Sequence, residues 1–274
     1  MWVLFESVHA VTYFAPEARA AFEAAGLRGY WRGYFAGRAA PLGAVNAAPV
    51  IALFSSFAPH MVGRAIPDVW TRATPEAAIA ARAEGAAAAL RALGAADGVE
   101  EAADLAERAA GLAPTSGRAL GAANAGLPRL ADPVARLWQA TTTLREHRGD
   151  GHVAALVGAG LAGTPALVLK AALEGYPAIY GPARGWSDEE WARTGEALAA
   201  RGYLADDGTP TEAGRAAYQA VEDVTDRLAG EVWRALGEAE TRRLAELLRP
   251  VARAASSAMP FPNPIGVPRP ADVG

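Results

Sequence analysis

Hydrophobic and polar positions follow a helical period along most of the chain, and prolines and glycines mark where the helices break. Glu6 to Ala25 predicts a helix that Pro16 divides into two, with a glycine ending the second. The aromatic segment from Leu27 to Pro41 carries glycines four residues apart, which share one helical face and allow close packing of another helix. Val50 to Ile66 is a further apolar helix, broken by Pro59.

Capping residues indicate where the next helices begin. Thr74–Pro75–Glu76 combines an N-cap, a proline in the first turn and an acidic residue, which predicts a helix to about Leu93. Gly98 to Ala110 predicts another helix. Residues 111–133 are rich in glycine and proline and are expected to form a surface connection. Asp132–Pro133 then begins a helix that we expect to end near His147.

The last part of the chain is also mainly helical by its pattern. The turn residues at 203–208 predict a short strand and a tight turn, the only sign of β structure, and residues 176–185 predict a loop. The Pro-rich segment from Met259 cannot be helical and is expected either to dock on the body or to be mobile. Helices are expected at residues 153–161, 164–174, 187–201 (with a Ser-x-x-Glu capping box), 211–228 and 238–254.

One segment resembles part of a known DNA-binding fold. Residues 186–228, including WSDEEWARTGEALAARGYLADDG and TEAGR, are similar to the recognition helix, wing and following helix of MarR-type winged-helix regulators. More broadly, HAVTYFAPEARAAF, GYWRGYFAGRAAPLG and LREHRGDGHVAALV resemble an actinobacterial family of proteins with a helix-turn-helix-like domain. The resemblance implies a bacterial protein with a mainly α fold: a helical domain at 1–130, a degenerate winged-helix domain at 131–258 and a Pro-rich tail at 259–274. A homodimer formed through the terminal helices is implied by analogy.

The charge of this segment disfavours DNA binding. The whole chain has a formal charge of −4, and its sequence pI is about 5.7. Ser187 to Arg201 carries four acids against two arginines, and the turn at Asp206–Asp207 adds two acids and no base. A recognition helix normally presents basic or neutral polar side chains to phosphates and base edges. We therefore expect DNA binding only if another surface provides it.

The densest polar cluster is Arg145–Glu146–His147–Arg148–Gly149–Asp150–Gly151–His152, expected to form a loop between two helices. His147, Asp150 and His152 have a spacing that suits a zinc or iron site, or a histidine–carboxylate pair for acid–base catalysis. The alternative is an ordinary turn in which Asp150 caps the next helix. These three residues are the candidate catalytic set, and the sequence leaves the metal and any cofactor unidentified.

Further residues could contribute to a ligand site. On a helix, Glu6, His9 and Tyr13 share one face, although a core histidine with a satisfied hydrogen bond has the same pattern. The aromatic segment offers an apolar wall with an arginine that could clamp an anion, or an ordinary aromatic core. The candidate ligand-binding residues are His9, Tyr13, Trp31, Tyr34, Arg38, His60, Arg145 and Glu146.

Several function classes lack their signals. The chain has no cysteine, which fits a reducing compartment, and no P-loop, HExxH or GxSxG motif. No signal peptide or membrane-spanning stretch is indicated, so we expect a cytoplasmic protein. Basic residues are almost all arginine, and Lys170 is the only lysine.

The leading hypothesis is a small-molecule-binding helical protein, either an enzyme of specialised metabolism or a resistance or sequestering factor. Its pocket would lie between the N-terminal helices and residues 147–152. The alternatives are a ligand-responsive regulator and a protein–protein adaptor with an acidic docking face.

Overall fold

The computed structural model describes residues 1–95 and 97–270, and this part of the chain contains fourteen α-helices, two short 3-10 helices and no strand. The prediction of a mainly α protein is therefore confirmed. The α-helices are α1 (Trp2–Phe14), α2 (Pro16–Ala24), α3 (Tyr30–Ala39), α4 (Ala47–Leu53), α5 (Pro59–Gly63), α6 (Pro75–Ala92), α7 (Val99–Gly111), α8 (Ala119–Ala125), α9 (Pro133–Gly158), α10 (Thr164–Glu174), α11 (Pro177–Ala183), α12 (Asp188–Ala200), α13 (Glu212–Leu236) and α14 (Glu238–Ser256).

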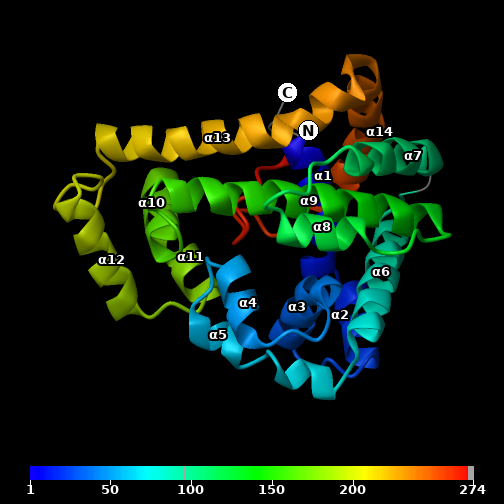
Figure 1. Ribbon diagram of the computed structural model, residues 1–274, viewed down its shortest axis with the longest axis horizontal. Coiled ribbons are helices and arrows are strands. Elements are labelled where there is room, and N and C mark those ends of the chain that lie inside the picture. The colour runs from blue at the N-terminus through cyan, green and yellow to red at the C-terminus, as the bar shows by residue number, and fades with distance from the viewer. Residues whose placement is uncertain (96, 271–274) are drawn as a thin grey trace.

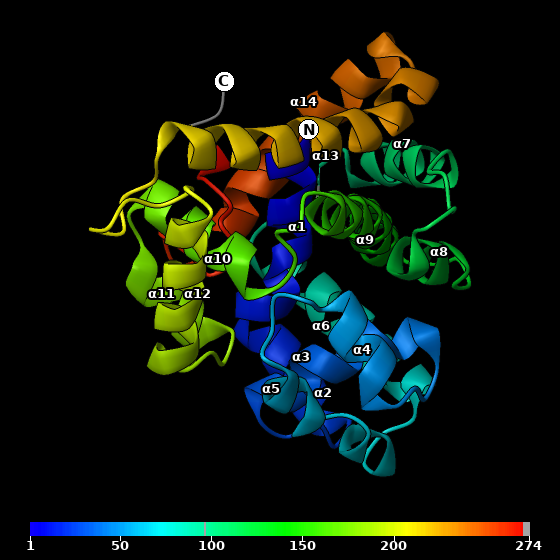
Figure 2. The ribbon, with the colours of Figure 1, turned by 60° about the vertical axis from the view of Figure 1, so that its left-hand side comes forward.

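Helix α9 runs through the middle of the molecule, and most other elements pack around it (Figure 1). It contacts α1, α6, α7, α8 and α13. Helices α10, α11 and α12 gather at one side of the molecule, where α13 passes over them (Figure 2). The largest core cluster contains Phe5, Leu90, Trp138 and Leu248, so it joins residues from both sides of the boundary expected at residue 130. The division into domains stays a prediction.

Local capping signals correctly predicted several helix starts. Pro16 separates α1 from α2, and Pro59 separates α4 from α5. The Thr74 hydroxyl accepts a hydrogen bond from the Ala77 N–H at the start of α6. Close packing in the aromatic segment is also confirmed, because Cβ atoms at Gly33 and Gly37 would collide with the ring of Phe22.

The loop expected at residues 147–152 is wrong, because this segment is the interior of α9. The two glycines suggested a break in the helix, but Gly151 has a packing role. The Arg118 side chain crosses the helix there and donates from Nη1 to the carbonyl oxygen of His147 at 2.9 Å. A Cβ at residue 151 would overlap with this guanidinium. Glycine is therefore required for the contact, and the helix continues through it.

Two other expected loops contain helices. The connection at residues 111–133 includes α8, which packs on α9 and buries Leu120 and Asn124. The segment 176–185 includes α11, in which Tyr180 is buried. Both helices are seven residues long, so their sequences are too short to show a clear helical period.

The segment that resembles a winged helix, residues 186–228, consists of α12, a turn and the first part of α13. Ser187 caps α12 and forms the predicted capping box with Glu190. The turn closes with a single antiparallel bridge between Leu204 and Pro210 in place of the predicted strand. A small apolar core packs this segment against α9 and α10, and it includes Leu161, Leu169, Leu198, Leu204 and Val221. The winged-helix assignment itself stays a prediction.

The described part of the Pro-rich tail docks on the body, which was one of its two expected states. Met259, Asn263 and Val267 are buried. The Asn263 side chain holds the tail in a turn, because it donates to the Val267 carbonyl oxygen and accepts from the Val267 N–H. This turn brings Pro264 and Ile265 against the interior of the molecule.

Candidate ligand cavity

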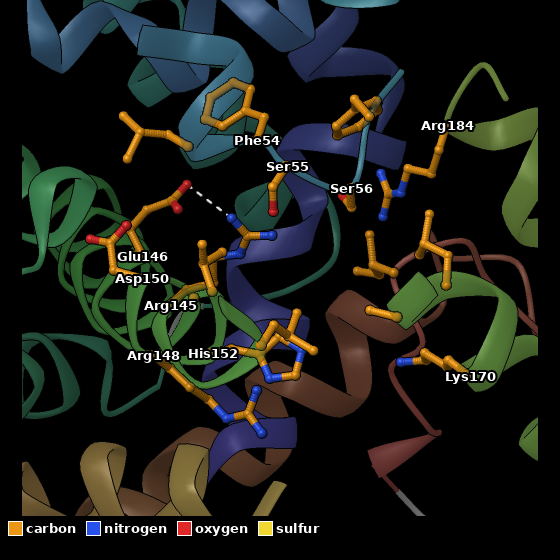
Figure 3. A pocket seen from close by; sticks show the side chains of 18 of the residues that line it. Phe54, Ser55, Ser56, Arg145, Glu146, Arg148, Asp150, His152, Lys170 and Arg184 are labelled. Carbon is orange, nitrogen blue, oxygen red and sulfur yellow. Dashed lines mark ion pairs between the residues drawn. The ribbon is translucent and has the colours of Figure 1, made fainter. Parts of the chain in front are cut away.

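A cavity of about 210 Å³ lies between α9, the α3–α4 side of the N-terminal half, and the α10–α11 pair. The Pro-rich tail completes the wall through Pro264 and Ile265, and α13 contributes Tyr218 and Glu222. Figure 3 shows side chains from these separate elements converging on the same space. The cavity therefore joins the N-terminal helices to the segment that resembles a winged helix.

Basic side chains outnumber acidic ones along the wall. The five basic residues are Arg38, Arg145, Arg148, Lys170 and Arg184, and the four acidic residues are Glu6, Glu146, Asp150 and Glu222. Three of the acids, Glu6, Glu146 and Asp150, are buried, and burial disfavours the charged form of a carboxyl group unless a cation or hydrogen-bond donor lies beside it. The arrangement of ion pairs decides which cations remain for a ligand.

Glu146 is the centre of the most buried ion-pair network. Its carboxylate accepts from Nε and Nη2 of Arg38, both at 2.9 Å, and lies 2.9 Å from Nη1 of Arg145. Arg145 also donates from Nε to Glu6 at 3.2 Å. Burial opposes ionisation of Glu146, but Arg145 and Arg38 hold its pKa well below the usual value. Arg38 and Arg145 are thus neutralised within the protein.

A second polar group connects α9 to α13. Arg148 donates from Nη2 to Glu222 at 3.2 Å and to Asp226 at 3.3 Å. His152 shares a hydrogen bond with the Thr225 hydroxyl at 3.0 Å. Burial lowers the pKa of His152 to about 4, although Glu222 acts in the opposite direction. His152 is therefore neutral near pH 7, and this part of the wall adds little net charge.

Arg184 differs from the other arginines of the cavity because it has no ion pair with any carboxylate of residues 1–95 and 97–270. Its Nη2 donates to the Pro264 carbonyl oxygen at 2.8 Å, and its guanidinium lies 4.5 Å from the centre of the Phe57 ring. Its Nε is buried and has no hydrogen-bond partner in the same part of the chain. Figure 3 shows this guanidinium directed into the cavity.

Asp150 lies at the cavity wall but has a structural partner. Its carboxylate accepts the backbone N–H of Gly121 at 2.8 Å, in the first turn of α8. A carboxylate in this position favours helix formation through the helix dipole. Asp150 therefore accepts a hydrogen bond at the start of α8, and not at the start of a helix that follows it in the sequence. Burial raises the pKa of Asp150 to about 6, although the Gly121 N–H opposes the shift.

Six of the predicted site residues line the cavity: Tyr34, Arg38, Arg145, Glu146, Asp150 and His152. Because residues 147–152 are helical, the three members of the proposed catalytic set do not converge: His147 and Asp150 lie against α8, whereas His152 bonds with Thr225 of α13. His147 is turned away toward α8, where its Cα lies 3.0 Å from the position of a Cβ at Gly121. Burial and Arg118 lower the pKa of His147 to about 4.

His9 and Tyr13 form a buried network beside the cavity instead of lining it. The His9 ring shares hydrogen bonds of 2.9 Å with the hydroxyls of Thr142 and Tyr13, and it stacks on Trp138. Burial and the neighbouring Arg145 lower the pKa of His9 well below its usual value. This matches the core role that we weighed for His9. Trp31 packs against Phe57, outside the cavity lining, and His60 is exposed on α5.

The sequence patterns did not identify much of the cavity wall. The apolar part of the lining combines aromatic rings from four helices and the α4–α5 connection with aliphatic side chains, and the polar groups without a predicted role include Ser55, Ser56, Lys170, Arg184 and Glu222. Only Lys170 had a signal in the sequence, as the single lysine of the chain. Tyr34 was predicted, and its environment is unusual. Burial alone would raise its pKa, but Arg38 and Arg184 together lower it.

The described residues contain no cluster of three or more histidine, aspartate or glutamate side chains arranged to hold a metal ion. The same part of the chain has no helix long and apolar enough to cross a membrane.

The outer face of α12 is acidic and exposed, as its sequence suggested. Glu189 and Glu196 are exposed there with Arg193, and Asp206 and Asp207 are exposed on the following turn. Arg201 is engaged elsewhere, because it donates to the Gly160 carbonyl oxygen at 2.9 Å. This face would repel a phosphate backbone.

A comparison with known families gives one match: the model of a helix-turn-helix family covers residues 1–262. Neither the curated proteins nor the solved structures include a significant match to this chain.

Proposed function

From the premise that the chain belongs to this helix-turn-helix family, we propose that it binds a small, partly apolar organic anion in the cavity beside α9. The volume of about 210 Å³ suits a compact organic molecule. The ligand would touch both the N-terminal helices and the segment that resembles a winged helix.

The observation that carries this proposal is the state of Arg184. A guanidinium directed into a cavity, with a single carbonyl oxygen as its hydrogen-bond acceptor and no carboxylate partner in the described chain, is costly unless a ligand supplies an anion. The other arginines of the wall are already paired with Glu146, Glu6 or Glu222. An anionic group is therefore expected at Arg184, and carboxylate, sulfonate or phosphate groups fit its planar donors.

The rest of the wall favours an aromatic or otherwise apolar body for the ligand. Phe54, Phe57, Tyr34 and Tyr180 contribute rings, and the hydroxyls of the adjacent Ser55 and Ser56 can fix its orientation.

Anilinonaphthalenesulfonate, an aromatic sulfonate that fluoresces when bound in an apolar site, tests the proposal. We expect saturable binding that weakens roughly 10- to 150-fold in Arg184→Met, because a charge-assisted hydrogen bond contributes about 1.5–3 kcal/mol. Methionine keeps the apolar stem against Phe57 while removing the charge. The matched control is Arg193→Met on the exposed face of α12, which should leave the affinity unchanged.

N-phenylnaphthylamine, which has the same rings without the sulfonate, separates apolar from anionic recognition. Its binding should be insensitive to Arg184→Met. Equal weakening of both dyes, or no change for either, would contradict an anion site at Arg184. Thermal melting of each variant establishes that the fold is intact.

A second candidate function is a ligand-responsive transcription regulator. The family match favours it, and so does the cavity wall, because α10, α11 and α13 contribute Lys170, Tyr180 and Glu222 to it. A bound ligand would then contact the elements that surround α12. Since the exposed face of α12 is acidic, DNA would have to bind another surface.

A mobility-shift titration with the DNA upstream of the protein's own gene tests this alternative. A regulator should give a shift whose affinity falls steeply with salt, because phosphate contacts release counterions. The absence of any shift at low salt would end this hypothesis while leaving ligand binding in place.

A further inference from the structure

Lys170 is the only lysine among 26 basic residues of the chain, and its side chain lies in the wall of the cavity. It belongs to α10, and its side chain is 21% exposed. Figure 3 shows it extending into the space opposite α9. Arginine serves at every other basic position, so charge alone does not distinguish this site.

The two basic side chains differ in chemistry. Arginine stays protonated under all ordinary conditions, whereas a lysine amine can lose a proton and attack a carbonyl carbon. The single lysine of a chain that otherwise uses arginine is therefore a candidate for a reaction that requires a primary amine. The cavity gives the amine access to a ligand.

The surroundings of the amine contain a proton acceptor. The Glu174 carboxylate lies 3.5 Å from Nζ, one helical turn farther along α10. The buried Tyr180 hydroxyl donates to the other oxygen of Glu174, which fixes the carboxylate in place. Gly266 of the docked tail packs directly against the amine, because a Cβ there would overlap with Nζ. Residues of α10, α11 and the docked tail thus fix the position of the amine.

We infer that Lys170 forms a reversible imine with an aldehyde or ketone group of the ligand that the cavity binds. This inference rests on the proposed function, since the anionic group of the same ligand would lie at Arg184. The ligand class is then an anionic carbonyl compound with an apolar body.

The step balances without any co-reactant. The Lys170 ammonium group gives one proton to Glu174, and the neutral nitrogen forms a bond to the carbonyl carbon. The carbonyl oxygen then takes one proton from the nitrogen and one from Glu174, and the carbon–oxygen bond breaks to release water. The product is a protonated imine on Lys170, and hydrolysis reverses it.

Pyridoxal phosphate is a suitable probe because it combines a ring, a phosphate and an aldehyde. The full-length protein is incubated with it, reduced with borohydride and mapped by peptide mass spectrometry. We expect saturable labelling of Lys170, at least about tenfold faster than labelling of the side-chain amine of Nα-acetyllysine at the same pH, because the cavity orients the aldehyde. Lys170→Arg and Lys170→Met should both lose the adduct while keeping the wild-type melting temperature.

Pyridoxine phosphate has an alcohol in place of the aldehyde and serves as the matched ligand. It should protect Lys170 from labelling and displace anilinonaphthalenesulfonate from wild type and from Lys170→Met. Displacement of the dye without fast labelling of Lys170 would overturn the imine and leave the anion site standing. Failure of both phosphates to displace the dye, with no adduct at Lys170, would overturn both proposals. An adduct that pyridoxine phosphate does not block, or that persists in the Lys170 variants, would also refute the inference.

Discussion

Glu146→Gln removes one charge from the buried network while keeping the size and shape of the side chain. In the wild type, the Glu146 carboxylate is 2% exposed, accepts two hydrogen bonds of 2.9 Å from Arg38, and forms an ion pair with Arg145 at 2.9 Å. After the substitution, Arg145 keeps its ion pair with Glu6, but Arg38 keeps only uncharged partners, such as the Tyr34 hydroxyl. The variant therefore contains a buried arginine without an anion.

The expected loss in the free energy of unfolding is about 3–5 kcal/mol, the usual cost of removing one partner from a buried ion pair. For a chain of this size, the loss corresponds to a melting temperature lower by roughly 6–20 °C. The pKa of Glu146 is held below its usual value by Arg145 and Arg38 despite its burial. Its contribution is therefore present above about pH 4.3, the pKa of an unfolded glutamate, and is lost as the pH falls below that value.

Urea unfolding followed by circular dichroism measures this loss. The matched control is Glu101→Gln, because Glu101 makes the same two-bond pair with Arg243, at 2.7 and 2.6 Å, but both side chains are 49% exposed. Solvent screens an exposed pair, so the control should lower the free energy of unfolding much less than Glu146→Gln does. Equal losses for the two variants would show that burial does not determine the strength of the Glu146 network.

Two further substitutions test the packing of α9. Burial raises the pKa of Asp150 to about 6, so its ionisation opposes folding: stability should fall as the pH rises from about 4 to about 6, and Asp150→Asn should remove this component in unfolding measured across that range. A pH profile unchanged in Asp150→Asn would refute the shift. Gly151→Ala should cost about 1–3 kcal/mol because its Cβ collides with the Arg118 guanidinium, whereas Gly158→Ala, which meets no atom within 4 Å, should be neutral or slightly stabilising. Equal melting temperatures for the two alanine variants would contradict the packing role of Gly151.

The sequence correctly predicted those features of the fold that depend only on a residue and the backbone next to it. The caps at Thr74 and Ser187 and the breaks at Pro16 and Pro59 are of this kind, and each appears in the structure. Gly151 shows the opposite case. Because Gly151 has no side chain, Arg118 from a distant segment can cross α9 there. The glycine therefore did not mark a loop, as its local sequence had suggested.

The candidate site was predictable to a similar degree. Arg38, Arg145 and Glu146 were singled out as polar residues in apolar surroundings, and they meet at the cavity. Arg184 could not be distinguished from the other arginines by sequence, because its lack of an anion depends on the elements that surround it. The directions of His147 and His152 likewise follow from the continuity of α9.

The docked tail has a consequence for the synthesis of the protein. Pro264 and Ile265 belong to the cavity wall, and Gly266 packs on Lys170. Until this segment has been synthesised, the cavity lacks this part of its wall and is open to water on that side. Truncation after residue 258 would remove Pro264, Ile265 and Gly266, so this side of the cavity should then be open to water.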